Sequence, residues 1–183
     1  MALSNFSLSL FLKSKPRVFP KLVATLTPPR SLKSSLSHGK QLHMMLLFSA
    51  SPTVAEIGAL AGYDVVVVDL EHGPGSVSEA LHCIRAVKAA CSSSVIRVPE
   101  VTSAWDKKTL DVGPDGIMFR KIENAKEAEY AMSLCRYPPD GVPGCAYSLV
   151  RDSDFGFRQT YLQDYKERLL IMCQVNTTSF LLV

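Results

Sequence analysis

Residues 65–76 read Val-Val-Val-Val-Asp-Leu-Glu-His-Gly-Pro-Gly-Ser, and this stretch decides the fold. Four consecutive β-branched residues bounded by glycines predict a short strand that is buried on both faces. Asp69, Glu71 and His72 follow where the apolar run stops. Because ligands of parallel α/β proteins bind at the carboxyl ends of the strands, these three side chains are candidate site residues.

The rest of the chain alternates between predicted strands and helices. Apolar runs predict strands at 44–49, 64–70, 94–98, 116–119 and 168–175. Capping residues and apolar periodicity predict helices at 52–61 (with Thr53 as N-cap), from Ser76 onward, and at 104–112, 124–135 and 161–167. No hairpin signal separates the strands, so we expect an α/β fold with a parallel sheet and right-handed crossovers.

Two architectures satisfy this alternation: a doubly wound sheet, or part of a (β/α)8 barrel. A complete barrel needs about 250 residues, and the whole chain has 183. A barrel of this length would therefore contain about five of its eight βα units.

Charge is distributed unevenly along the chain. Residues 1–55 contain seven basic residues and no acidic residue, whereas the remainder has 13 basic and 17 acidic residues. The net positive charge therefore belongs to the N-terminal segment and does not indicate a nucleic-acid-binding surface. No apolar run approaches about 18 residues, so we expect no membrane span.

Residues 1–40 are rich in serine, basic and free of acid, which is typical of an organellar transit peptide. Only two arginines precede residue 40, which favours the plastid over the mitochondrion. The alternative is a disordered basic tail on a cytoplasmic protein. The five cysteines form no C-x-x-C pair and lie mostly in apolar stretches, so we interpret them as reduced structural thiols.

Position alone makes three residues candidates for catalysis. His72 could act as a general acid or base, and Arg97 at a strand end could bind a carboxylate or a developing enolate. Asp111 could orient His72. The structural alternatives are a loop histidine, an ordinary ion pair and a solvated helix end. Residues 73–76 could also cradle a phosphate at a helix N-terminus, although the glycine pattern is incomplete.

Several motifs resemble those of the HpcH/HpaI aldolase/citrate lyase family. They are Val68–Pro74, Ile96–Pro99, Leu110–Gly113, Cys135–Gly144 and Ile171–Val175, and the resemblance covers roughly residues 42–175. It implies a (β/α)8 barrel and a homo-oligomeric lyase in full-length relatives. The implied reaction forms or cleaves 4-hydroxy-2-oxo acids, with pyruvate and an aldehyde as the smaller partners.

The resemblance also implies roles for individual residues. His72 would be the base, oriented by Asp111, and Arg97 would hold the keto oxygen of pyruvate and stabilise the enolate. A divalent metal, Mg²⁺ or Mn²⁺, would chelate pyruvate. Asp69 and Glu71 would lie beside the metal or at the substrate edge, and Gln174 would line the substrate pocket.

The chain departs from the family pattern at the predicted metal site. Asn176 stands where the family has a metal-binding glutamate, and residues 176–183 resemble nothing in the family. A neutral amide is a weaker ligand than a carboxylate. We therefore expect a domain at 41–175 that is truncated after its fifth strand, has no direct metal ligands of its own, and is weakly active or inactive.

A second departure lies at the end of the predicted strand 116–119. Arg120 stands where the family usually has proline, and Lys121 follows it, so two charges would alter the pocket. Two other functions stay open. The chain could be a non-catalytic truncated isoform that associates with full-length subunits or is degraded, or a lyase acting on acyl-thioesters such as citryl or malyl groups.

Overall fold

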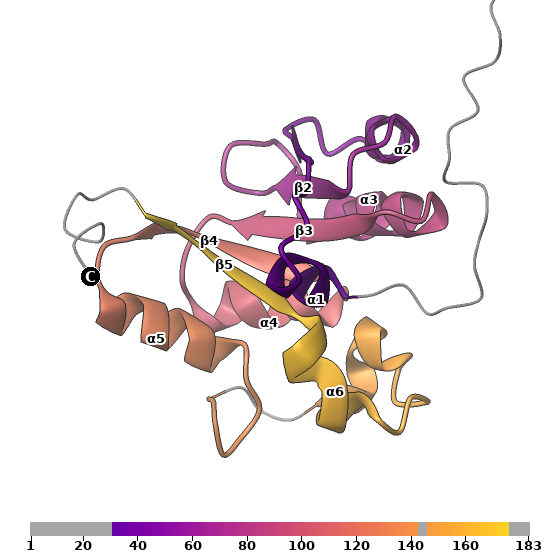
Figure 1. Cartoon of the computed structure of the whole chain (residues 1–183). Helices are drawn as coiled ribbons and strands as arrows, with labels where there is room; N and C mark the ends of the chain where they lie inside the picture. The colour runs from indigo at the N-terminus through magenta and orange to yellow at the C-terminus, as the bar shows by residue number, and fades with distance from the viewer. Residues whose placement is uncertain (1–30, 143–145, 176–183) are drawn as a thin grey trace, which may run out of the picture.

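The computed structural model describes residues 31–142 and 146–175, which form one parallel sheet with helices on both faces (Figure 1). The strands are β1 (Met44–Leu47), β2 (Val65–Asp69), β3 (Ser93–Val98), β4 (Gly116–Ile122) and β5 (Leu170–Val175). The helices are α1 (Leu32–Ser37), α2 (Pro52–Leu60), α3 (Val77–Ala89), α4 (Ser103–Asp111), α5 (Ala125–Leu134) and α6 (Tyr161–Arg168). Short 3-10 turns, η3 (Tyr147–Leu149) and η4 (Arg151–Ser153), precede α6.

Strand order distinguishes the two architectures that the sequence left open. The sheet runs β1-β2-β3-β4-β5, and all four strand pairs are parallel. Each strand therefore adds to the same side of the previous one, as in a barrel, whereas a doubly wound sheet reverses its order. The predicted partial (β/α)8 barrel is confirmed, with five strands in the part of the chain that the structure describes.

Strand β2 forms the centre of the core, as its four valines predict. All four are fully buried. Val66 and Val68 pack against the outer helices, whereas Val65 and Val67 face the inner side of the sheet. Because successive side chains point to opposite faces, Asp69 shares the inner face with Val65 and Val67.

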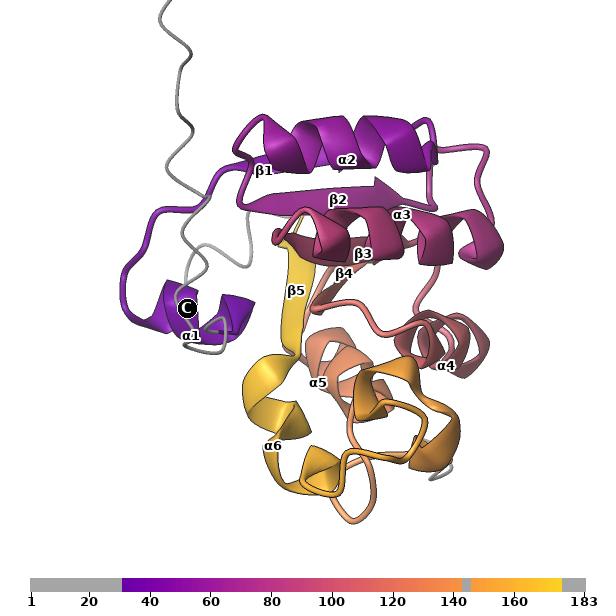
Figure 2. The same cartoon turned by 90° about the vertical axis from the view of Figure 1, so that its right-hand side faces the viewer.

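Helix α1 covers part of this inner face, opposite α3 and α4 (Figures 1 and 2). Leu32 packs against Val65, Val67 and Val95. Lys33 Nζ donates to the carbonyl of Lys166 at 2.7 Å, which ties α1 to α6. This differs from the expected disordered leader through residue 40, because composition alone does not reveal that Leu32 finds an apolar surface. The expectations for residues 1–30 and 176–183 lie outside the described residues.

Two local predictions are corrected and one is confirmed. Helix α2 is capped by Ser51, whose Oγ accepts from the Val54 amide at 3.4 Å, and not by Thr53. Proline at the first helical position, between the two candidates, fits a cap at Ser51. Ser76, where the sequence predicts a helix to begin, is the N-cap of α3 and forms a capping box with Glu79. Strand β4 continues to Ile122, beyond the expected end, through an irregularity between Phe119 and Ile122.

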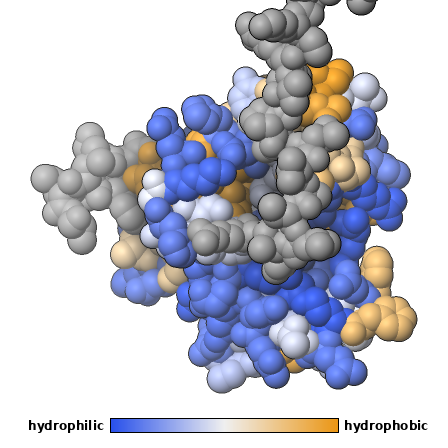
Figure 3. All heavy atoms as spheres, turned by 45° about the vertical axis from the view of Figure 1, so that its right-hand side comes forward, coloured by the Kyte–Doolittle hydropathy of each residue, from blue (hydrophilic) through white to orange (hydrophobic). Residues whose placement is uncertain are grey.

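The surface combines polar and apolar areas. Hydrophobic side chains lie at the top of the view in Figure 3, where Figures 1 and 2 place α2, and the lower part around α6 is mostly hydrophilic. Within the described residues, no helix is both long and apolar enough to cross a membrane. Cys83, Cys91, Cys135 and Cys173 are free thiols.

Candidate active site

The inner face at the carboxyl end of the sheet, which we call the mouth, gathers the predicted polar residues. In the strand register Asp69 pairs with Arg97, and Arg97 with Met118. These residues form one layer across the sheet. Arg120 and Gln174 lie two residues further along their strands, nearer the mouth. The parallel topology therefore brings together side chains from four strand ends.

Arg97 is held by a bidentate ion pair in the interior. Its Nε lies 2.9 Å from Asp69 Oδ1 and its Nη2 lies 2.5 Å from Asp69 Oδ2. Asp69 is fully buried and Arg97 is 7% exposed. Asp69 Oδ1 also accepts from the backbone amides of Glu71 at 2.9 Å and His72 at 3.4 Å. The fork geometry and these extra contacts fix the guanidinium in one orientation.

The same contacts set the protonation of the pair. Burial alone would raise the pKa of Asp69, but hydrogen bonds from Arg97 and from the Glu71 amide hold that pKa below its ordinary value. The hydrogen bond to Asp69 raises the pKa of Arg97. The pair is therefore a carboxylate and a guanidinium at neutral pH.

Glu71 connects three cationic or titratable groups. Its Oε1 lies 3.4 Å from His72 Nε2 and 3.3 Å from Arg120 Nη1, and its Oε2 lies 3.4 Å from Arg97 Nε. The Glu71 side chain is 11% exposed, and its buried Oε2 makes no hydrogen bond with the described residues. One carboxylate thus links both arginines to the imidazole.

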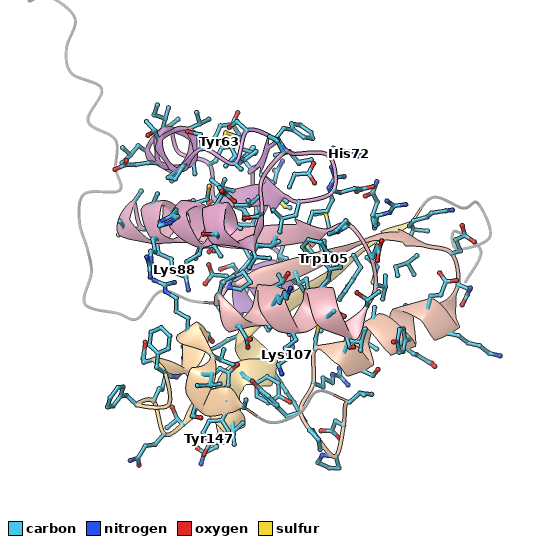
Figure 4. All side chains as sticks on the ribbon, turned by 180° about the vertical axis from the view of Figure 1, so that it is seen from behind. Tyr63, His72, Lys88, Trp105, Lys107 and Tyr147 are labelled. Atoms are coloured by element: carbon cyan, nitrogen blue, oxygen red, sulfur yellow. The ribbon has the colours of Figure 1, made fainter. Side chains whose placement is uncertain are left out.

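His72 lies at the rim of this cluster. Its side chain is 64% exposed, and Figure 4 shows it at the opposite end of the sheet from Lys88, which lies in the last turn of α3. An exposed imidazole beside a carboxylate can exchange protons with a bound substrate or with water.

The structure does not bring Asp111 to His72. Asp111 is the last residue of α4, which runs back from β3 towards the start of β4. Two residues later, the Gly113 carbonyl oxygen accepts a hydrogen bond from Lys88 Nζ at 2.8 Å. Lys88 lies at the end of the sheet opposite His72 (Figure 4). Within the described residues of a single chain, Asp111 therefore lies away from His72 and does not orient it. Glu71 is the carboxylate that lies next to the imidazole.

Gln174 lies beside Arg97 at the mouth. It comes from the exposed end of β5, and its Oε1 accepts from Arg97 Nη1 at 3.5 Å, a long hydrogen bond. This contact joins the last strand of the described sheet to the Arg97 cluster. The Gln174 side-chain amide therefore lies on the side of Arg97 that faces the mouth.

The glycines after β2 have a packing explanation. A Cβ on Gly73 would lie 2.5 Å from the Asp69 carbonyl oxygen and 2.6 Å from that of Phe48. A Cβ on Gly75 would lie 2.4 Å from the Cβ of Ala50. Close approach of the chain after β1 thus requires both glycines, and their presence gives no support to a phosphate cradle.

The donor set at the mouth does not fit a divalent cation. Both Asp69 oxygens bind Arg97, and the Glu71 carboxylate faces two guanidinium groups, which would repel a metal ion. Across residues 31–142 and 146–175, no three His, Cys, Asp or Glu side chains are placed to hold a metal. Position 176, where the resemblance places a ligand, lies outside the described residues.

Arg120, whose charge was expected to alter the pocket but to which no role was assigned, also lies at the mouth. It shares the inner face with Met118, two positions earlier on β4, and its side chain is 39% exposed. The period-two pattern of β4 would have predicted this direction had the strand been extended past Phe119. The sequence alone shows that Arg120 is charged. Its contact with Glu71 depends on the register of β2, β3 and β4 in the sheet.

Comparison with known proteins agrees with this geometry. Residues 42–181 match the model of the HpcH/HpaI aldolase/citrate lyase family. The chain is 31% identical over 158 residues to "2-keto-3-deoxy-L-rhamnonate aldolase" of Escherichia coli O17:K52:H18, with 86% of this chain and 58% of the relative covered. The chain therefore spans under two thirds of that relative's length.

Two solved structures share the fold. An HpcH/HpaI aldolase/citrate lyase family protein from Burkholderia cenocepacia has a TM-score of 0.76 and 35% identity, covering 81% of this chain and 60% of the other. The HpcH/HpaI aldolase from Desulfitobacterium hafniense has a TM-score of 0.72 and 30% identity, covering 81% and 58%. The chain belongs to the HpcH/HpaI aldolase/citrate lyase family.

Proposed function

We propose that this protein is a 2-oxo-acid aldolase of the pyruvate type, which forms or cleaves 4-hydroxy-2-oxo acids. The observation that carries the proposal is the fixed Arg97. Its guanidinium is held by a buried bidentate carboxylate, and one Nη group approaches Gln174 on the side of the mouth. This is the arrangement expected of a preorganised anion-binding group.

Such a group suits enolate chemistry. Removal of a proton from the methyl group of pyruvate leaves negative charge on the keto oxygen. A guanidinium already oriented at that oxygen stabilises the charge without reorganisation in the transition state. Arg97 is preorganised in this sense, because Asp69 fixes its position before substrate binds.

His72 is the proposed proton acceptor. Its exposed imidazole lies at the rim of the mouth, where it can take the methyl proton and return it to the product. Glu71 lies 3.4 Å from its Nε2 and supplies the orienting carboxylate that Asp111 does not.

The family relationship implies a divalent metal, which would supply Lewis-acid stabilisation of the enolate in relatives that bind one. Because the described donors do not fit such an ion, each step above uses this chain's residues alone. For the same reason we expect the complete aldol reaction of this chain to be weak.

The test is pyruvate binding by saturation-transfer NMR, with exchange of the methyl protons for deuterium as a second readout. Wild type and the exposed control Arg85→Met should bind pyruvate, whereas Arg97→Met should not. Arg97→Lys, which keeps the charge but loses the fork, should bind weakly. Equal binding by all four folded proteins, with or without Mn²⁺, would contradict the proposal.

A second candidate function is association with longer subunits without catalysis. It is favoured by the apolar outer side of α2, where Val54, Ile57 and Leu60 are 42%, 59% and 60% exposed. Apolar groups gathered on one helix mark an interaction surface. The wild-type chain should then co-purify with a co-expressed longer family subunit, and Ile57→Glu should abolish the association; failure of the wild-type chain to co-purify would contradict this candidate.

We also propose that the N-terminal segment directs import into an organelle, with the plastid first and the mitochondrion second. Cleavage at residue 40 would remove α1 and its contacts with α6 and the sheet. Processing before Ser31 would keep them. Mass spectrometry of the mature N-terminus tests the position, and a fluorescent fusion tests the compartment.

A further inference from the structure

We propose that Arg120 is a specificity-determining residue that favours 2-oxo acids carrying a second anionic group, a carboxylate or a phosphate. The inference rests on the proposed 2-oxo-acid function. It concerns the part of the ligand that reaches beyond the keto acid itself.

The position of Arg120 supplies the first argument. Met118 pairs with Arg97 across β3 and β4, and Arg120 lies two residues further along the same face of β4. Because β4 is irregular between Phe119 and Ile122, the regular rise of about 3.3 Å per residue gives an upper limit of roughly 7 Å for the advance of its Cα beyond that of Met118 towards the mouth. The two cations are therefore arranged along the line by which a ligand would enter.

The second argument is the number of uncommitted donors. A guanidinium has five N–H groups. Arg97 uses two on Asp69 and directs a third towards Gln174, and it is buried. The ion pair that the structure records for Arg120 is with Glu71 at 3.3 Å, and its side chain is 39% exposed. Arg120 therefore has donors that a ligand can reach.

The third argument is charge. Asp69 and Glu71 together would outweigh Arg97 and make the mouth repel an anion. Arg120 brings these four groups to neutrality, so a monoanionic 2-oxo acid can bind at Arg97. A ligand whose second anionic group lies about four bonds from its carboxylate carbon, at roughly 1.5 Å per bond, would extend towards Arg120 and take over part of its contact with Glu71.

Lys121 provides a matched control on the next residue. It has the same charge, but its side chain is 59% exposed and pairs with Glu123 at 3.4 Å. Its backbone is in the left-handed region at φ 50°, within the irregular end of β4. Replacing it changes the net charge as replacing Arg120 does, without touching Glu71.

The experiment titrates the full chain with pyruvate, 2-oxoglutarate and 3-phosphohydroxypyruvate and measures binding by NMR or calorimetry. In wild type and Lys121→Gln, at least one dianion should bind about tenfold more tightly than pyruvate, because a charge-assisted contact is added. In Arg120→Gln the mouth keeps one uncompensated negative charge, so pyruvate should bind more weakly but still measurably, and the preference for dianions should fall to about one. The tighter dianion identifies carboxylate or phosphate as the favoured group.

The proposal is overturned if Arg120→Gln still prefers dianions over pyruvate. It is also overturned if Lys121→Gln loses the preference for dianions to the same extent as Arg120→Gln, since the net charge of the protein would then explain the preference. Binding of pyruvate by wild type without any preference for dianions also overturns it, and leaves the 2-oxo-acid function standing. Failure of wild type to bind any of the three compounds rejects the proposed function itself.

Discussion

Replacement of Arg97 by methionine tests the central ion pair most directly. The substitution leaves the Asp69 carboxylate fully buried without its guanidinium, although the amides of Glu71 and His72 remain as donors. Breaking a buried pair from one side costs about 3–5 kcal/mol. With two backbone donors retained, we expect the free energy of unfolding to fall by about 3 kcal/mol at pH 7.5.

The loss should depend on pH in a defined direction. In wild type the lowered pKa of Asp69 contributes stability that is present above the unfolded value, near 3.8, and lost as pH falls through the folded value. In Arg97→Met the burial effect dominates and raises the pKa of Asp69, so the variant gains stability as the carboxyl takes up a proton. The difference between the two proteins should therefore be smaller at pH 4.5 than at pH 7.5.

The assay is urea unfolding followed by circular dichroism and by the fluorescence of Trp105, the single tryptophan. Arg85→Met, on the exposed side of α3, should change stability by less than about 0.5 kcal/mol. Adding Asp69→Leu to Arg97→Met removes the unpaired charge and should recover part of the loss. If the double variant is no more stable than Arg97→Met alone, the reasoning from an uncompensated buried carboxylate is refuted.

Three further predictions concern other parts of the fold. Asp106 is 1% exposed, its oxygens make no hydrogen bond within the described chain, and burial raises its pKa to about 7. The free energy of unfolding should therefore fall as pH rises from about 4 to 7. Asp106→Asn should remove this pH dependence and stabilise the protein at pH 8 by up to about 4 kcal/mol, as measured by urea unfolding. Gly73→Ala should cost about 1–3 kcal/mol, because its Cβ would overlap two carbonyl oxygens; an unchanged melting curve would contradict this. Ser76→Ala should cost about 1 kcal/mol by loss of the capping box, and Ser76→Asp should restore most of it.

The sequence predicted the central strand and the direction of its side chains for a simple physical reason. Four β-branched residues leave little choice but a buried strand, and the period of two then places Asp69 on the same face as Val65 and Val67. The alternation of strands and helices predicted a parallel sheet, but strand order was open. Order depends on which strands pair, and a single sequence holds no direct record of pairing.

The contacts within the site could be predicted only in part. Asp69 and Arg97 lie 28 positions apart, and their pair requires the register of β2 against β3. The link from Glu71 to Arg120 requires β4 as well. Local pattern indicated that these groups lie at one edge, and tertiary register decided which of them touch.

Helix α1 illustrates a different limit. Its residues belong to a segment whose composition resembles a leader, and nothing local distinguishes Leu32 from its neighbours. Burial of that side chain at 4% exposure depends on an apolar face built from β2 and β3. The contact is between residues far apart in the chain, and composition cannot report it.

The position of Asp111 follows from the topology of the βα unit alone. In such a unit the helix returns from the carboxyl end of one strand to the amino end of the next, so its last residue lies at the edge opposite the site. His72 follows a strand and Asp111 ends a helix, and the two therefore occupy opposite ends. The same rule shows why Glu71 takes the orienting position. It lies two residues past the end of β2, and Arg97 and Arg120 lie near the carboxyl ends of β3 and β4. In this fold the groups that share chemistry are those that share the carboxyl edge.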